Sequence, residues 1–324
     1  MRRLTEITGL FPVEYPTTRE LNASPEARAT DVNAAFADPD IHGIIATIGG
    51  DDQITVIPHL DSSLITRNPK PFLGYSDNTN LHNFLWSLGI ASFYGGSTQV
   101  HLGPGPFVDD VHALSLRAAL LEGGRVELID PGHSEDFGLP WTDKRALTDF
   151  GVRTPTEPWT WSGPEQIVEG ITWGGCLEVI DQLALAGRLP SNEELAGAIL
   201  VIETSELLPD ADQVSRWIRS LGERGLLSSV NGVLVARPPV SALGAPSPSS
   251  AECSRLRADQ RDAVVNQVQR YNADAVICVG VPFGHTRPQW IIPYGGSVSL
   301  DGKRRIVRAD YGEPNPTPTR PASI

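Results

Sequence analysis

The chain has 324 residues, of which 40% are hydrophobic and 20% are charged, a composition typical of a globular protein with a full-sized core. A net charge of −13 without any polybasic run excludes a protein that wraps a nucleic-acid backbone, because such proteins need a basic face. No stretch approaches the roughly 18 apolar residues of a membrane span, and the N-terminus lacks the apolar segment of a signal peptide.

Helical and strand patterns alternate along the chain. It opens with a helical pattern over residues 1–10, where an α/β domain usually opens with a strand. Short apolar runs predict buried parallel strands over residues 43–49, 71–75, 198–203, 232–237 and 275–280. Apolar residues at helical spacing predict helices over residues 174–187, 211–225 and 261–271. This alternation predicts an α/β fold.

Composition divides the chain into four expected segments. Residues 1–130 are expected to form an N-terminal α/β domain, and residues 166–310 a C-terminal α/β domain. The stretch between them, 131–165, is rich in Pro, Gly, Thr and Trp and has no sustained period, so it is predicted to be a linker with loops. Residues 241–254 are predicted to be a flexible insertion, and 311–324 a disordered tail.

Ser76 stands where a predicted strand meets a predicted helix. A strand, then serine, then a helix places the hydroxyl at the carboxyl edge of a sheet, beside the positive end of the helix. The nucleophile elbow of serine hydrolases uses this arrangement, although Asn78 interrupts its G-x-S-x-G pattern. Serine is also a common helix cap, so the pattern alone is compatible with both roles.

Other polar residues also follow predicted strands. Gly49 and Gly50 present backbone N–H groups suited to an oxyanion or a phosphate, although such a pair is also an ordinary tight turn. Glu203 ends the strand 198–203, and Glu206 lies three residues further on and is a second candidate for the working acid. A solvated strand end is the alternative for Glu203.

Histidine and cysteine spacing bears on catalysis and metal binding. His285 follows the strand 275–280 in a Gly- and Pro-containing loop, and no histidine shows HxxxH or HxH spacing for a metal. Three widely spaced cysteines, with no CxxC pair, favour reduced thiols in a cytoplasm over a disulfide framework. The order Ser76, Glu203, His285 permits a nucleophile–acid–base triad, but order alone is weak support because many proteins place such residues after strands.

Five co-linear blocks resemble one family. The segments "DIHGIIATIGGDDQITVIPHLD", "KPFLGYSDNTNLHNFLWSLGIASFYGG", "ITWGGCLEVIDQLALAG", "AILVIETSE" and "VPFGHTRPQWIIPYGG" are similar to successive blocks of the LD-carboxypeptidase family of serine peptidases. The resemblance covers roughly residues 1–310. The sequences "GGDDQ" and "EPWTWSG" are more similar to the microcin C immunity branch than to the murein-recycling branch.

The resemblance implies both a fold and a site. It implies a flavodoxin-like N-terminal domain of the class I amidotransferase type, joined to a C-terminal α/β domain, with the site between them. The family's G-Y-S-D serine falls on Ser76, its strand-end glutamate on Glu203 and its G-H-T histidine on His285. The oxyanion donors fall on the backbone N–H groups of Gly50 and Asp77. Family members are usually homodimers that need no metal or cofactor.

The resemblance also sets expectations about the sheet and the substrate. The family pattern opens with a strand and an "SP" turn upstream of Met1, so we expect the N-terminal sheet to lack that strand. Arg237 and Arg287 are candidates for binding a substrate carboxylate, with structural ion pairs as the alternative. Trp159 and Trp161 are candidates for stacking on a nucleobase, with cover for the domain junction as the alternative.

Three functions follow as hypotheses. The first is a serine amidase that cleaves the amide between an acidic aminoacyl residue and a modified nucleotide, as in microcin C immunity. The second is a murein LD-carboxypeptidase that removes the terminal D-alanine from an L,D-linked tetrapeptide. The third is an inactive relative that binds a small molecule. None of the three requires nucleic acid or a membrane as a partner.

Overall fold

The structure is a computed structural model, and it describes residues 2–315. Its helices are α1 (Arg2–Thr8), α2 (Pro25–Ala37), α3 (Ser62–Arg67), α4 (Thr79–Ser87), α5 (Asp110–Arg117), α6 (Leu177–Leu185), α7 (Ala211–Glu223) and α8 (Ser250–Tyr271). From residue 316 on, the tail that was predicted to be disordered lies outside the described residues. Among residues 2–315, no helix is long and apolar enough to cross a membrane.

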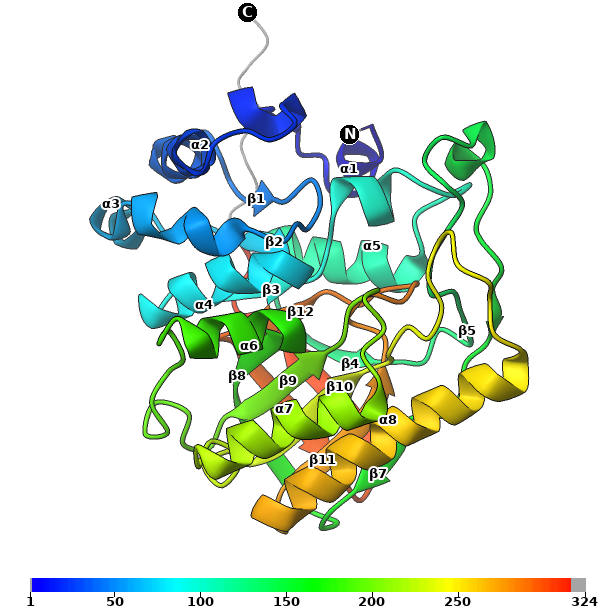
Figure 1. Ribbon diagram of the computed structural model, residues 1–324. Coiled ribbons are helices and arrows are strands. Elements are labelled where there is room, and N and C mark those ends of the chain that lie inside the picture. The colour runs from blue at the N-terminus through cyan, green and yellow to red at the C-terminus, as the bar shows by residue number, and fades with distance from the viewer. Residues whose placement is uncertain (1, 316–324) are drawn as a thin grey trace, which may run out of the picture.

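A four-stranded sheet carries the N-terminal part of the fold. Its strands are β1 (Ile44–Ile45), β2 (Phe72–Gly74), β3 (Ser92–Tyr94) and β12 (Ile292–Tyr294), in that order. The first three strands are parallel, and β12 joins β3 antiparallel. Strands β1 and β2 lie within the predicted runs 43–49 and 71–75, whereas β3 was not predicted from the sequence. A strand from late in the chain therefore completes the sheet built by the N-terminal residues (Figure 1).

An eight-stranded sheet forms the larger layer. Its order is β4-β14-β13-β8-β9-β10-β11-β7, with β4 (Arg125–Leu128), β7 (Thr160–Ser162), β8 (Ile167–Cys176), β9 (Ile199–Glu203), β10 (Gly232–Ala236), β11 (Val276–Val281), β13 (Ser297–Asp301) and β14 (Ile306–Asp310). Strands β8 to β11 are parallel, and the remaining strands are antiparallel additions. Two short strands, β5 (His133–Ser134) and β6 (Thr154–Pro155), pair separately within the predicted linker.

One hydrophobic core joins the two large sheets. The same cluster of buried side chains includes Leu73 and Tyr94 from the four-stranded sheet and Val201 and Ile277 from the eight-stranded sheet. Helix α4 packs on β3, β8 and α6 and so lies between the sheets, while α7 and α8 pack together over the larger sheet (Figure 1). Because the core is continuous, the carboxyl ends of β2, β9 and β11 are held close to one another.

The prediction of a flexible insertion over residues 241–254 is wrong for residues 250–254, which are helical. Helix α8 begins at Ser250, where the side chain of Ser249 accepts a hydrogen bond from the backbone N–H of Glu252. Arg255 then pairs with Glu252 and Asp259 one turn away on each side. Cap and ion pairs stabilise the first turns of a helix whose Ser- and Pro-rich start resembles a loop in composition.

Candidate active site

Ser76, Glu203 and His285 meet at the carboxyl ends of three strands. Ser76 follows β2, Glu203 is the last residue of β9, and His285 lies in the loop after β11. Ser76 Oγ is 3.1 Å from His285 Nε2, and Glu203 Oε2 is 2.5 Å from His285 Nδ1. The structure thus brings all three predicted residues into one hydrogen-bonded chain, in the order that a serine nucleophile, a histidine and an orienting acid require.

The backbone at Ser76 has an unusual conformation. Its φ is +63°, in the left-handed region that non-glycine residues avoid at a cost of about 1–3 kcal/mol. A 3₁₀ turn over Ser76–Asn78 follows at once and leads into α4. Sharp strand-to-helix turns of this kind expose the serine hydroxyl above a sheet in α/β hydrolases. The conformation therefore favours a presented side chain over a simple helix cap, since the Ser76 hydroxyl makes no cap hydrogen bond here.

The glycine pair lies against the Ser76 turn. A Cβ added to Gly49 would lie 3.1 Å from Ser76 Oγ, and one added to Gly50 would lie 3.0 Å from the Asp77 carboxylate. That carboxylate is buried and accepts hydrogen bonds from Gln53 N and Asn80 Nδ2. Small residues therefore let the backbone after β1 approach the serine closely, which is where oxyanion donors would have to lie.

Tyr94 is a member of the site that the sequence reasoning missed. Its side chain is fully buried, and its hydroxyl donates to Glu203 Oε1 at 2.6 Å. The Tyr94 hydroxyl oxygen also accepts a hydrogen bond from the backbone N–H of Ser76 at 3.1 Å. The hydroxyl therefore ties the second oxygen of Glu203 to the backbone of the serine turn. Its only signal in the sequence is a tyrosine that ends the short apolar stretch "SFY" before Gly95-Gly96.

The charges around His285 raise its pKa. Burial alone would lower the pKa of the imidazole, but Glu203 and Glu206 outweigh burial and raise it to about 10. Burial also raises the pKa of Glu203, and hydrogen bonds from His285 and Tyr94 offset part of that rise. The hydrogen bond to His285 lowers the pKa of Glu206 to about 2. Both carboxylates therefore favour the protonated form of His285.

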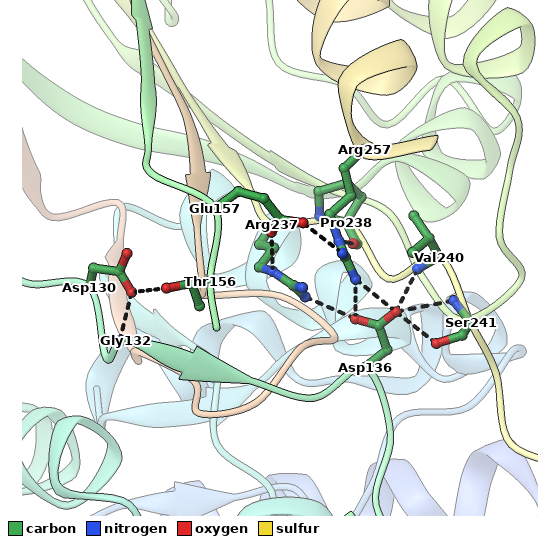
Figure 2. A network of polar contacts seen from close by, with 10 residues as sticks. All are labelled: Asp130, Gly132, Asp136, Thr156, Glu157, Arg237, Pro238, Val240, Ser241 and Arg257. Atoms are coloured by element: carbon green, nitrogen blue, oxygen red, sulfur yellow. Dashed lines mark hydrogen bonds and ion pairs between the residues drawn. The ribbon is translucent and has the colours of Figure 1, made fainter. Parts of the chain in front are cut away.

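Both predicted arginines form ion pairs. Arg237 is buried, and its guanidinium contacts Asp136 Oδ1 at 2.8 Å and Glu157 Oε2 at 3.4 Å (Figure 2). Arg287, two residues beyond the histidine, lies 3.5 Å from Glu135 Oε1 and donates to the carbonyl of Val100. These contacts are the structural alternative noted from the sequence. A role in binding substrate stays a prediction for both residues.

The two predicted tryptophans lie along the edge of the larger sheet. Both are half-buried and pack against the main hydrophobic core. Trp161 belongs to β7 and pairs in register with Cys278, and a Cβ on Gly280 would contact Trp159.

Metal binding was also considered from the sequence. In the described part of the chain, no group of three or more His, Cys, Asp or Glu side chains is arranged to hold a metal ion.

Comparison with known proteins relates the chain to one family. The LD-carboxypeptidase N-terminal domain matches residues 1–95, and the LD-carboxypeptidase C-terminal domain matches residues 169–300, together more than half of the chain. A putative carboxypeptidase from Treponema pallidum is 26% identical over 297 residues, which is 88% of this chain and 77% of that protein.

Solved structures share the fold. A crystal structure of an MccF-like protein from Streptococcus pneumoniae in complex with AMP is 24% identical, with a TM-score of 0.79 over 96% of this chain and 91% of that one. The microcin C7 self-immunity protein MccF in complex with aspartyl sulfamoyl adenosine is 21% identical, with a TM-score of 0.77 over 94% of this chain and 87% of that one. These similarities confirm the predicted α/β fold with its two-part LD-carboxypeptidase architecture.

Proposed function

Because this chain belongs to the LD-carboxypeptidase family of serine peptidases, we propose that it hydrolyses an amide with Ser76 as nucleophile, His285 as base and Glu203 as orienting acid. The observation that carries the proposal is the continuous hydrogen-bonded chain from Ser76 Oγ through both nitrogens of His285 to Glu203. The strained backbone of Ser76 and the tie through Tyr94 support it, since both fix the geometry of the reacting groups.

The mechanism follows from these positions. Ser76 Oγ attacks the amide carbonyl carbon while its proton passes to His285 Nε2, and Glu203 stabilises the resulting imidazolium through Nδ1. The negative oxygen of the tetrahedral intermediate is held by the backbone N–H groups of Gly50 and Asp77. Nε2 then gives the proton to the leaving nitrogen. A water molecule deprotonated by the same nitrogen attacks the acyl-serine, and collapse releases the acid and restores Ser76.

The proposed substrate is an acidic aminoacyl residue joined through an amide to a modified nucleotide. Support comes from the shared fold with MccF bound to aspartyl sulfamoyl adenosine and with an MccF-like protein bound to AMP. Trp159 and Trp161 would offer aromatic surface to the base, and Arg287 is the candidate nearest the site for a substrate carboxylate. The active protein is proposed to be a homodimer, which light scattering of the purified protein tests directly.

The function is tested by incubating the purified protein with aspartyl sulfamoyl adenosine and, separately, with an L,D-linked tetrapeptide, and by following the products by mass spectrometry. We expect release of free aspartate by the unmodified chain and none by Ser76→Ala. Release of D-alanine from the tetrapeptide alone would reject the nucleotide substrate in favour of the murein substrate. A folded protein that binds either compound without cleaving it would reject catalysis altogether.

A further inference from the structure

A second carboxylate contacts the histidine of the proposed site. Glu206 lies on the turn after β9, and its Oε2 is 3.0 Å from His285 Nε2. The same Nε2 is the atom that lies 3.1 Å from Ser76 Oγ. The Glu206 side chain is 66% exposed, whereas that of Glu203, on the other side of the ring, is fully buried. The proposed mechanism gives no role to this exposed carboxylate.

The turn that carries Glu206 is fixed at its base. Glu178 Oε1, from α6, accepts hydrogen bonds from both the backbone N–H and the hydroxyl of Ser205. The Ser205 hydroxyl in turn accepts from the N–H of Leu207. The backbone on either side of Glu206 is therefore held while its carboxylate faces solvent. Such a side chain can change partner by rotating about its own bonds, without moving the turn.

The contact with Glu206 conflicts with the role of His285 as a base. An ionised carboxylate can only accept hydrogen bonds, so it requires an N–H at Nε2, whereas a base must offer a lone pair there to the serine hydroxyl. With Glu203 accepting from Nδ1, the ring carries both protons. The ionisable groups facing the ring or lying near it are Glu203, Glu206, Tyr75, His101 and Arg287.

The size of this conflict follows from the pKa of the histidine. The Tyr75 ring meets the His285 ring at an angle, and burial lowers the pKa of His101. Of these groups, Glu203 and Glu206 are the ones that raise the pKa of His285. Because the two carboxylates raise the pKa of His285 to about 10, the protonated imidazole predominates at pH 7 and the neutral base is the minor form. A substrate that removed Glu206 from Nε2 would therefore increase the fraction of molecules in which His285 is neutral and can act as a base.

We propose that Glu206 is a specificity-determining residue that leaves His285 to bind a positively charged amino group on the acyl side of the scissile bond. This inference rests on the proposed function. A cation on the substrate would offer the Glu206 carboxylate a charge-assisted hydrogen bond in place of the one it gives up at the imidazolium. Glu206 Oε2 and Ser76 Oγ both contact His285 Nε2, at 3.0 and 3.1 Å, so an α-ammonium beside a carbonyl at Oγ falls within reach of Glu206.

The test compares two substrates that differ in one charge. Aspartyl sulfamoyl adenosine with a free amino group and the same compound N-acetylated are assayed with the unmodified chain, Glu206→Gln and the control Glu193→Gln. Glu193 is exposed and lies on the loop before β9, so its variant removes one carboxylate from the surface away from His285. We expect the unmodified chain and the control to prefer the free amine by about tenfold or more in kcat/KM. For Glu206→Gln we expect the preference to fall to about threefold or less.

A second measurement does not depend on turnover. The pKa of the His285 ring is followed by NMR in the unmodified chain and in Glu206→Gln, where we expect it to fall by about one unit or more. An unchanged amine preference in Glu206→Gln, or an unchanged His285 pKa, would overturn the role of Glu206. Failure of the proposed function gives a different result, because then neither substrate is cleaved by the unmodified chain although the NMR shift persists.

Discussion

Two groups of charged residues in this molecule, each built around buried side chains, are organised differently. The first joins Asp136, Glu157, Arg237 and Arg257, and ties the predicted linker to β10 and α8 (Figure 2). Asp136 also accepts from the backbone N–H groups of Val240 and Ser241 and from the Ser241 hydroxyl. Among the described residues, the buried side-chain atoms of Asp136 and Arg237 all have hydrogen-bond partners.

The second group, around Ser76, combines a strained backbone with competing partners for one histidine nitrogen. The serine has a left-handed backbone, and one nitrogen of His285 faces two acceptors, Ser76 Oγ and Glu206. The first group is therefore a structural ion-pair network, in which each charged side chain is paired with an opposite charge. The second leaves one atom with a choice of partner, which is what a reacting site requires. Each prediction below alters one of the two groups and compares the effect on activity with the effect on stability.

The largest effect on activity is expected from Ser76→Ala. Without the nucleophile, kcat/KM should fall by about 10⁴-fold or more, because only binding and the oxyanion donors remain. Steady-state kinetics on the substrate that the chain cleaves measures this loss, and urea denaturation should show stability within about 0.5 kcal/mol of the unmodified chain. A variant that keeps a tenth of the activity would show that another residue attacks the substrate.

Asp136→Asn should have the reverse effect. It leaves Arg237 and Arg257 short of a buried counter-charge, which typically costs about 3–5 kcal/mol, while kcat of the folded protein should be unchanged. Denaturant titration and kinetics on the same samples separate the two effects. A large loss of kcat in protein shown to be folded would mean that this group serves catalysis and not only structure.

Asp136 should also make the stability of the fold depend on pH. Burial would raise the pKa of Asp136, but Arg257 and Arg237 outweigh burial and hold the pKa below its ordinary value. A depressed carboxyl pKa adds stability that is complete above the unfolded-state pKa of about 4 and is lost as the pH falls through the folded-state value. The unmodified chain should therefore lose more stability than Asp136→Asn when the pH is lowered below about 4. Equal losses would contradict the assignment.

Gly284→Ala should damage the site without adding or removing a polar group. A Cβ at this position would lie 2.5 Å from Glu203 Oε2, so the carboxylate must shift away from His285. Misplacement of a catalytic group by about 1 Å typically costs about 100-fold in rate. Kinetics of the folded variant gives the size of the loss. Full activity would show that the position of Glu203 is not critical.

Tyr94→Phe should have the smallest effect on activity of the three substitutions at the proposed site. The variant keeps the buried ring but removes the hydroxyl that links Glu203 to the Ser76 backbone. Loss of a hydrogen bond to a charged group is worth about 1.5–3 kcal/mol, so kcat/KM should fall by about 10- to 100-fold. If kcat/KM is unchanged while stability falls, Tyr94 supports only the fold.

The sequence predicts much of the site because its residues end buried strands. Ser76, Glu203 and His285 each follow an apolar run, and the family resemblance connects them. The contact of Glu206 with Nε2 depends on how two distant loops pack, and the sequence showed only that Glu206 lies near the end of β9. The left-handed φ of Ser76 is likewise set by tertiary packing, since serine itself prefers other conformations.

Other features were predictable only in part. Ser249 followed three residues later by Glu252 is a helix-start pattern, but the surrounding Pro and Ser residues favoured a loop prediction over residues 241–254. The antiparallel addition of β12 to β3 pairs Ile292 with Tyr94, residues separated by most of the chain. Nothing in the sequence of either strand indicates which strand it pairs with. The addition of β12 to the N-terminal sheet could therefore not be predicted from the sequence.

The most direct test of the central claim is the rate at which a fluorophosphonate labels Ser76. The labelled residue is identified by peptide mass mapping, and the rate is followed with pH in the unmodified chain and in His285→Ala. We predict labelling at Ser76, at a rate that rises as His285 loses its proton, and a loss of about 10³-fold or more in His285→Ala. A folded protein that is not labelled at Ser76, or a His285→Ala variant labelled at the full rate, would contradict the account.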